Sequence, residues 1–401
     1  MQGAPRPALS SGKPTPKGSN KTMIQLSQQF LKTTGKATQN ARDWLTQADH
    51  LIQAERTPFE AIYQEDIAQL RYYPPLNSDE IEVGDTKVAV EAKRYEIPLV
   101  IVAPLAVNMY IYDLFQNRSL VKFLTAKGFR VYMVDWGKPT SKHNHYHLST
   151  YFADMLPRML QQVRHHSGSQ QLSLHGWSFG GLFSYCYTAL HNDQDIKNLA
   201  LIGAPNDYHA NGEIGKLYQA LSKQLGWIEK RMGWKVHDSK RRFWRSPGWG
   251  NAVGFKLTNP INSVQGYWNL IRNLDDQNFV SNHATNSAFL DRMEAYPGGV
   301  VQDFVQHLWN KNVLAHGKLP MAGTPAKLAQ LNTSIFSVVG KQDPIVTPAC
   351  SHRLLEQISS QDVTVHEVKG GHMGILGGSN APQQSWFLLA DWLAERSGQP
   401  Q

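Results

Sequence analysis

Short, uninterrupted apolar runs alternate with helical stretches over the middle and the end of the chain. Such runs are typical of strands buried on both faces of a sheet. Six of them predict strands, at residues 97–103, 129–134, 171–174, 199–202, 334–339 and 363–368. Helical periodicity appears at residues 118–124 and 148–163 and again after Gly181. This alternation predicts an α/β fold, a mostly parallel sheet with helices on both faces.

The same patterns divide the chain into parts. Residues 1–22 are rich in Pro, Gly, Ser and Lys and lack a hydrophobic period, which predicts a disordered tail. From residue 23 to 75 apolar residues recur at helical spacing, which predicts an N-terminal helical region. Residues 76–204 and 332–396 hold the predicted strands and form the core. Residues 205–331 interrupt the alternation with a helical pattern and are expected to form a cap insertion.

Tryptophans are concentrated in this insertion. They are Trp227, Trp234, Trp244, Trp249 and Trp268. Large aromatic side chains in such a place either line a substrate tunnel or form the core of the cap. We expect most of them to form the cap's own core.

Composition excludes several classes of protein. Apolar residues make up 41% and charged residues 18% of the 401 residues, which is typical of a globular protein. No apolar run approaches the roughly 18 residues of a membrane-spanning helix, and the N-terminus lacks the apolar stretch of a secretory signal. The two cysteines, Cys186 and Cys350, cannot build a disulfide scaffold. A reducing cytoplasm fits best.

The formal net charge of +8 comes from two local patches. Residues 1–25 carry four bases and no acid, and residues 228–245 carry seven bases against two acids. Basic patches of this kind either bind a phosphate-bearing cofactor, an anionic surface or a nucleic acid, or they are a solvated tail and a solvated helix face with no partner. The remainder of the chain is nearly neutral.

The strongest chemical motif is a G-x-S-x-G sequence, residues 176–180, between a predicted strand and a predicted helix. In this context the serine occupies a tight strand-to-helix turn, and small residues on both sides let the neighbouring backbone approach. The positive end of the following helix then faces a developing oxyanion. The motif predicts that Ser178 is a nucleophile.

A serine nucleophile needs a base, and the base needs an orienting acid. Asp343 and His372 follow the fifth and sixth predicted strands, at the carboxyl ends where ligands bind in open α/β sheets. They also follow the serine in the order expected for this turn. The rival acids are Asp207, the second choice, and Asp362, at the wrong end of its strand. The rival histidines, His352 and His366, lie within predicted elements.

Two backbone donors are expected to hold the oxyanion. One is the amide of Phe179, and the other belongs to the loop after the first predicted strand, with Val107 preferred and Ala106 second. His143, His145 and His147 alternate, but no Asp, Glu or Cys nearby completes a metal site, so we expect no metal. No Gly-rich phosphate loop or dinucleotide fingerprint predicts a bound cofactor.

From Thr57 to about Gly377 the sequence resembles the polyhydroxyalkanoate (PHA) synthases, above all the short catalytic subunits of their two-subunit classes. The matching stretches run in family order. Beside the 176–181 turn, they are Thr57-Pro58-Phe59 with Ile62-Tyr63, Val107-Asn108 with Tyr110 and Asp113-Leu114, Arg118-Ser119-Leu120-Val121, Val131-Tyr132 with Asp135-Trp136-Gly137, Leu274-Asp275-Asp276 with Phe279-Val280, Asp343 with Ile345-Val346 and Pro348, and Gly371-His372-Met373-Gly374-Ile375.

This resemblance implies an α/β-hydrolase fold with a cap, and the transfer of hydroxyacyl groups from coenzyme A to a growing polyester. Ser178, Asp343 and His372 correspond to the family's nucleophile, acid and base, and the Val107 amide to its second oxyanion donor. The family's nucleophile is a cysteine, whereas this chain has Ser178. A thiolate suits repeated thioester exchange, and a serine triad suits hydrolysis. Cys186 lies two helical turns further on and cannot replace the serine.

We therefore expect a PHA synthase-like serine acyltransferase or hydrolase acting on hydroxyacyl-CoA thioesters or aliphatic polyesters. The alternatives are an esterase or PHA depolymerase that releases hydroxyacids, and a non-catalytic granule-associated or synthase-partner subunit. Trp177, Asn108, Arg241 and Arg242 are the expected substrate or CoA-binding residues. Coenzyme A enters only as part of the substrate.

The expected partners follow from the same resemblance. They are the acyl-CoA or polyester substrate, a second copy of the chain or a second synthase-type subunit, and the surface of polyester granules. No nucleic acid partner is expected. The expected location is the cytoplasm, at the surface of inclusion granules.

Overall fold

The computed structural model describes residues 35–44, 46–257 and 268–400. The expected disordered tail, residues 1–22, lies outside the described residues. The chain divides into two compact units, which are taken separately below.

The smaller unit comprises Met1–Ile52 and Asn262–Ala284. Its described part is helical at residues 35–44, in α2 (Ala48–Leu51), at residues 268–272 and in the first part of α9 (Gln277–Asp291). Asn40 Nδ2 donates to the Leu274 carbonyl at 2.7 Å, and Ser281 Oγ donates to the Leu51 carbonyl at 2.6 Å. The expectation of one cap insertion over residues 205–331 is therefore wrong for residues 268–284, because this stretch bonds to the N-terminal segment.

The larger unit, Gln53–Ile261 with Thr285–Gln401, contains one eight-stranded sheet in the order β1-β2-β8-β5-β9-β10-β11-β12. Its strands are β1 (Glu60–Glu65), β2 (Ala68–Tyr73), β5 (Leu99–Val102), β8 (Val131–Asp135), β9 (Leu172–Trp177), β10 (Ile196–Ile202), β11 (Ser334–Gly340) and β12 (Val363–Val368). The last six strands in this order are parallel to one another, namely β8, β5, β9, β10, β11 and β12. They are the six strands predicted from the apolar runs, so the parallel sheet is confirmed.

Strands β1 and β2 correct the prediction of a helical region over residues 23–75. They form an antiparallel hairpin, and β2 also pairs antiparallel with β8. Along β2 the side chains of Ala68, Leu70 and Tyr73 are buried, and because Tyr73 points to the opposite face from the other two, the strand is covered on both faces. Asp66 turns the chain with φ +50°. Pairing with β1 and β8, and not a local burial period, decides the structure of this segment.

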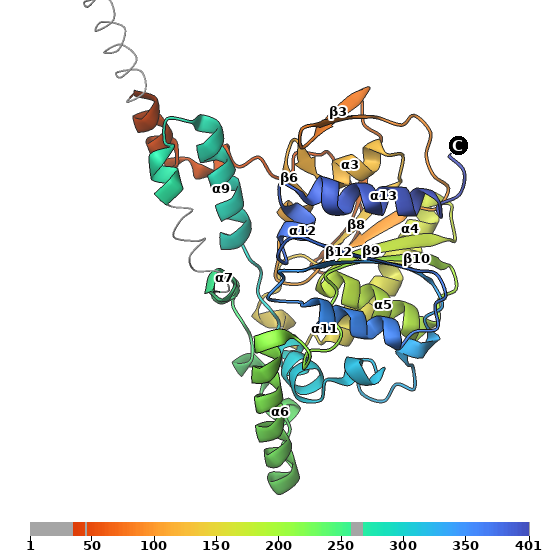
Figure 1. Ribbon diagram of the computed structural model, residues 1–401. Coiled ribbons are helices and arrows are strands. Elements are labelled where there is room, and N and C mark those ends of the chain that lie inside the picture. Colours follow the sequence, from red (N-terminus) through yellow and green to blue (C-terminus); the bar gives the residue numbers. More distant parts are fainter. Residues whose placement is uncertain (1–34, 45, 258–267, 401) are drawn as a thin grey trace, which may run out of the picture. The chain divides into compact units, whose positions relative to one another are not determined.

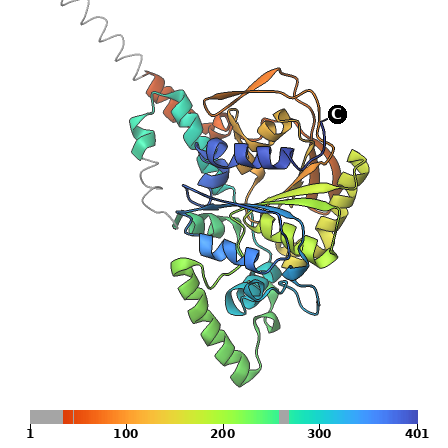
Figure 2. The ribbon, with the colours of Figure 1, turned by 45° about the vertical axis from the view of Figure 1, so that its right-hand side comes forward.

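Helices cover both faces of the sheet. Helices α3 (Leu120–Ala126) and α13 (Phe387–Ala394) lie on one side, and α5 (Phe179–His191) and α11 (Pro348–His352) lie on the other (Figures 1 and 2). The remaining helices are α4 (Leu156–Ser167), α6 (Gly212–Met232), α7 (Gly248–Leu257), α9 (Gln277–Asp291), α10 (Gly298–Asp303) and α12 (Gly374–Gly377). Two small ribbons, β3 (Glu80–Val83) with β4 (Thr86–Ala89) and β6 (Asp113–Phe115) with β7 (Arg118–Ser119), complete the elements.

The core lies between these layers. All four side chains of β5, Leu99–Val102, are fully buried. Burying one such side chain contributes roughly 1.5–3 kcal/mol, so the central strands account for much of the fold's stability. Among the described helices, none combines the length and the apolar character that a bilayer crossing requires.

The cap aromatics are more exposed than expected. Trp227 and Trp249 are 61% and 73% exposed, and Phe243 is 72% exposed. Helix α6, which carries Trp227, buries only Gly215 and extends away from the sheet (Figures 1 and 2). The expectation of a tryptophan core in the cap is therefore wrong for Trp227 and Trp249.

Candidate active site

Ser178 lies at the turn between β9 and α5, and its backbone is strained. Its dihedral angles are φ 54° and ψ −123°, a region that residues other than glycine rarely adopt. The Ser178 N–H donates to the Ile202 carbonyl on β10 at 2.9 Å, which fixes the turn against the sheet. A serine held in this way at the carboxyl end of a central strand has the geometry of an exposed nucleophile.

The turn fits only because Gly180 has no side chain. A Cβ on Gly180 would lie 1.9 Å from the Val102 carbonyl oxygen, which belongs to the neighbouring strand β5. Backbone at this place cannot give way without moving the sheet. The glycine thus lets the start of α5 approach β5 closely.

We expect Gly180→Ala to lower the free energy of unfolding by about 3 kcal/mol, because the clash is with backbone. Urea unfolding measures the change. Gly226→Ala on α6 is the matched control, since a Cβ there meets nothing within 4 Å. It is expected to be neutral or to stabilise the helix by up to about 1 kcal/mol. Equal effects of the two substitutions would contradict the packing argument.

Asp343 and His372 come together after β11 and β12, as predicted from their positions. His372 Nδ1 donates to Asp343 Oδ2 at 2.7 Å, and the two side chains are 4% and 0% exposed. Asp343 Oδ1 accepts from the amides of Ile345 and Val346 at 2.8 and 2.9 Å. The carboxylate is therefore held by both of its oxygens, and it leaves Nε2 as the imidazole nitrogen available to a serine hydroxyl.

Trp177 contacts both the backbone and the ring of His372. Its Nε1 donates to the His372 carbonyl at 3.1 Å, and the two ring centroids lie 5.0 Å apart. Trp177 is almost completely buried, so it positions the His372 loop while one edge lines the cavity described below.

The rival acids are engaged elsewhere. Asp207 Oδ1 accepts from the amides of His209 and Ala210 and from Asn312 Nδ2. Asp362 pairs with Arg396 at 2.9 Å. Of the rival histidines, His352 lies at the end of α11 and His366 within β12.

The two expected oxyanion donors lie at the same cavity. Phe179 is the first residue of α5, where a helical N–H has no partner within the helix. Val107 is buried, and within the described part of the chain its amide donates to no protein acceptor. Ala106 precedes it with φ +64°, a strained conformation that turns this loop.

These side chains meet at one cavity of about 330 Å³. Ser178, Phe179, Val107, Trp177 and His372 all line it. The other walls are mostly apolar, and apart from Ala106, the second choice for an oxyanion donor, the sequence predicts none of them as site residues. They are Pro104, Leu105, Ala106, Ile214, Gly250, Asn251, Gly254, Phe255, Met293, Tyr296 and Ile345. Burial raises the pKa of Tyr296, so its hydroxyl stays protonated at neutral pH.

Three expected substrate-binding residues lie outside this cavity. Asn108 donates through Nδ2 to the Phe289 and Arg292 carbonyls and accepts from the Tyr110 amide, so it braces a loop. Arg241 and Arg242 are exposed on a 3₁₀ turn, and among the described residues neither lines the cavity at Ser178. No structural observation links them to an acyl group in that cavity.

Cys186 is unsuited to act as the nucleophile. It lies within α5 and is fully buried. Burial raises the pKa of its thiol well above the ordinary value, so the reactive thiolate is not formed at neutral pH.

Comparisons with known proteins agree with this architecture. A family model described as "alpha/beta hydrolase fold" matches residues 107–379. A Poly(3-hydroxyalkanoate) polymerase subunit PhaC from Haloferax mediterranei is 28% identical over 353 residues, which cover 86% of this chain and 65% of that protein. The protein of the same name from Allochromatium vinosum is 26% identical over 355 residues, 87% of this chain and 93% of the relative.

One solved structure bears on the fold alone. A soluble variant of monoglyceride lipase from Saccharomyces cerevisiae, in complex with a substrate analogue, matches with a TM-score of 0.50 at 13% identity. The match covers 86% of this chain and 97% of the lipase.

Proposed function

The chain belongs to the α/β hydrolase fold family, and we propose that it is a synthase-like acyltransferase that forms an acyl-Ser178 intermediate from hydroxyacyl-CoA thioesters. The observation that carries this proposal is the strained Ser178 and the Asp343–His372 pair opening on one cavity. The relatives named as poly(3-hydroxyalkanoate) polymerase subunits support the substrate class.

In the first half-reaction His372 accepts the proton of the Ser178 hydroxyl while the oxygen attacks the thioester carbonyl. The amides of Phe179 and Val107 donate to the oxyanion. When the intermediate collapses, the carbon–sulfur bond breaks and His372 returns the proton to the leaving thiolate. Asp343 keeps the imidazole in the required tautomer and stabilises its charged form.

In the second half-reaction a hydroxyl group attacks the acyl-Ser178 ester. His372 takes the proton of that hydroxyl and then gives it to the Ser178 oxygen. The acceptor decides the product. The hydroxyl of another hydroxyacyl group lengthens a polyester, and water releases a free hydroxyacid. The mostly apolar walls, Phe255 and Ile345 among them, suit an aliphatic acyl chain and disfavour water.

The second candidate is an esterase or PHA depolymerase. The observation in its favour is the serine at position 178, where the resembling synthases have a cysteine. A serine ester is a poorer acyl donor to a second hydroxyl than a thioester is, whereas serine triads hydrolyse esters readily.

Product analysis with 3-hydroxybutyryl-CoA separates the candidates. We expect thiol release together with oligomeric esters in the mass spectrum. Butyryl-CoA is the control, because it lacks the hydroxyl that extends the chain and can only acylate the enzyme or be hydrolysed. Monomeric acid alone would favour the hydrolase. Absence of thiol release would contradict the acyltransferase.

The remaining expectations belong to the same proposal. Coenzyme A enters as part of the substrate, with Arg241 and Arg242 as candidates for its phosphates. A second copy of the chain or a synthase-type subunit is the proposed protein partner. The proposed location is the cytoplasm, at the surface of polyester inclusions.

A further inference from the structure

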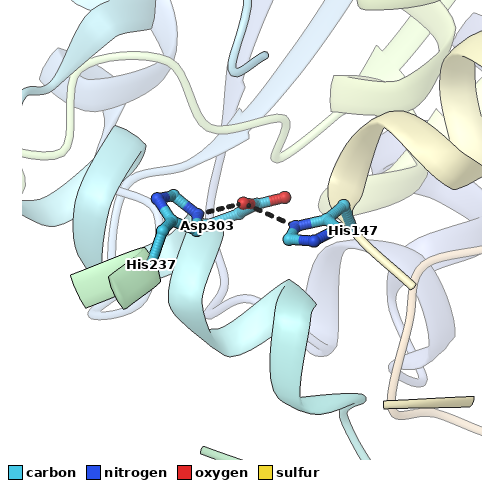
Figure 3. A group of neighbouring side chains, drawn as sticks. All are labelled: His147, His237 and Asp303. Carbon is cyan, nitrogen blue, oxygen red and sulfur yellow. Dashed lines mark hydrogen bonds and ion pairs between the residues drawn. The ribbon is translucent and has the colours of Figure 1, made fainter. Parts of the chain in front are cut away.

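Away from Ser178, three imidazoles surround one buried carboxylate. Asp303, at the end of α10, is 5% exposed in its side chain, and its Oδ1 accepts from His147 Nδ1 at 3.0 Å and from His237 Nε2 at 2.8 Å (Figure 3). Its Oδ2 accepts from the Leu148 amide at 2.7 Å. His307 Nε2 lies 3.9 Å from the same Oδ1. The group is far denser in metal-binding side chains than the rest of the described unit.

We propose that His147, His237 and Asp303 bind a divalent transition-metal ion of the zinc type. His307 lies near the place where a fourth ligand of the ion would bind. This site is distinct from Ser178 and does not depend on the proposed function. Imidazole and carboxylate are ligands that Zn²⁺ prefers, in tetrahedral sites with bonds of about 2.0–2.1 Å.

The spacing of the ligand atoms fits such a site. Bonds of that length at tetrahedral angles separate neighbouring ligand atoms by about 3.3 Å. One ligand atom from each of His147, His237 and Asp303 lies within 4.8 Å of the others, and the two printed contacts of Asp303 are 3.0 and 2.8 Å. Small side-chain rotations bring all three to one ion. Each imidazole then moves its proton to its other ring nitrogen, so the metal replaces two hydrogen bonds.

The residues around the cluster hold the proposed ligands in place, and a cavity lets an ion reach them. The Leu148 amide holds the second oxygen of Asp303, as outer partners of metal ligands commonly do. Gly299 makes room for one imidazole, because a Cβ there would lie 3.1 Å from His147 Nε2. A cavity of about 540 Å³, lined by all four side chains, gives access to an ion. Lys235 and Lys311 also line it, and Glu229 pairs with both at 3.9 and 3.4 Å.

The ligands come from segments far apart in the sequence. His147 precedes the π-helix Thr150–Met155 that leads into α4, whereas His237 lies in the 3₁₀ turn Val236–Asp238 of the cap. Asp303 precedes the π-helix Phe304–Asn310, which carries His307. An ion bound by all of them would cross-link the cap to the core and restrict the unfolded chain.

The cross-link would also fix a side chain at the active site. Phe304, next to Asp303, stacks on Phe179 with ring centroids 4.8 Å apart and an angle of 16°. Phe304 also contacts Tyr296, which lines the cavity at Ser178. Loss of the metal would therefore loosen this wall.

Metal analysis of the untagged full chain tests the proposal. After treatment with a chelator, the protein is titrated with Zn²⁺ against a chromophoric competitor, and bound metal is counted by mass spectrometry. We expect one ion per chain. At a Zn²⁺ concentration about 100-fold above Kd, the Tm should rise by about 3 °C.

His237→Ala should weaken Zn²⁺ binding by more than about 100-fold, since it removes a direct ligand. His145→Ala is the matched control, because His145 is exposed and, among the described residues, hydrogen-bonds to the Lys142 carbonyl and packs against the Tyr146 ring. It should keep full affinity. Asp303→Asn is a second variant, but it alters a buried carboxylate, so the partly exposed His237 carries the test. Absence of stoichiometric zinc, or equal affinity of the wild type and His237→Ala, would overturn the proposal and leave a hydrogen-bonded cluster.

Discussion

Ser178→Ala is expected to lower the rate of thiol release from 3-hydroxybutyryl-CoA by at least about 10⁴-fold. The hydroxyl is the atom that forms the acyl-enzyme, and the Phe179 and Val107 amides can supply only residual catalysis without it. The substitution removes one oxygen atom at the mouth of a cavity, so the fold should persist with an unchanged Tm. Steady-state assays of released thiol, with thermal unfolding beside them, measure both quantities.

Cys186→Ala is the control for this variant. Cys186 lies on α5, fully buried, and the pKa of its thiol is raised by that burial, so its removal should leave turnover intact. A fluorophosphonate probe provides a second readout, because it should label the wild type and Cys186→Ala but not Ser178→Ala. If Ser178→Ala keeps its turnover while Cys186→Ala loses it, the nucleophile is not Ser178.

The parallel sheet could be predicted because each strand is buried on both faces. Runs such as Leu99–Val102 and Ser334–Gly340 are almost wholly apolar and short, and helical stretches between them leave only a parallel arrangement. The sequence does not predict the antiparallel edge, since β2 is short and its buried residues follow no regular alternation. A short amphipathic segment next to helical sequence gives a weak local signal, and pairing with β8 decides its structure.

The residues of the candidate active site also fall into those that the sequence predicts and those that it does not. The placement of Ser178, Asp343 and His372 could be predicted because each follows a predicted strand, so the topology carries them to one edge of the sheet. The cavity walls could not, because Ile214, Phe255 and Tyr296 come from the insertion, whose packing depends on tertiary contacts. Charge alone marks Arg241 and Arg242 as candidates, and the charge of a residue does not determine where its side chain lies in the fold.

The histidine cluster shows a further limit of local patterns. The alternating triplet drew attention to His143, His145 and His147, but the structure separates them. His143 bonds to Thr140, whereas His147 turns to Asp303 and His237. Asp303 is 156 residues away from His147, and His237 comes from another segment of the cap. Only the fold can assemble such a set, so no local spacing motif predicts it.

Asp343→Asn is expected to lower kcat by about 10⁴-fold while KM changes little. The asparagine can keep the acceptor oxygen that holds the Ile345 and Val346 amides, so the loop should stay in place. Its amide nitrogen then faces His372 Nδ1, where the carboxylate now accepts a hydrogen bond. That nitrogen can only donate, so it favours the tautomer with the proton on Nε2, which cannot take a proton from Ser178.

Asp207→Asn provides the matched control at the rival acid. Asp207 Oδ1 accepts all of its contacts from backbone amides and Asn312, and an asparagine oxygen can accept the same bonds. Turnover should therefore be retained. Both variants are measured by steady-state kinetics, and unfolding curves show whether the fold is kept. If Asp207→Asn lost turnover while Asp343→Asn kept it, the orienting acid would be Asp207, and His372 would have to turn away from the carboxylate it contacts at 2.7 Å.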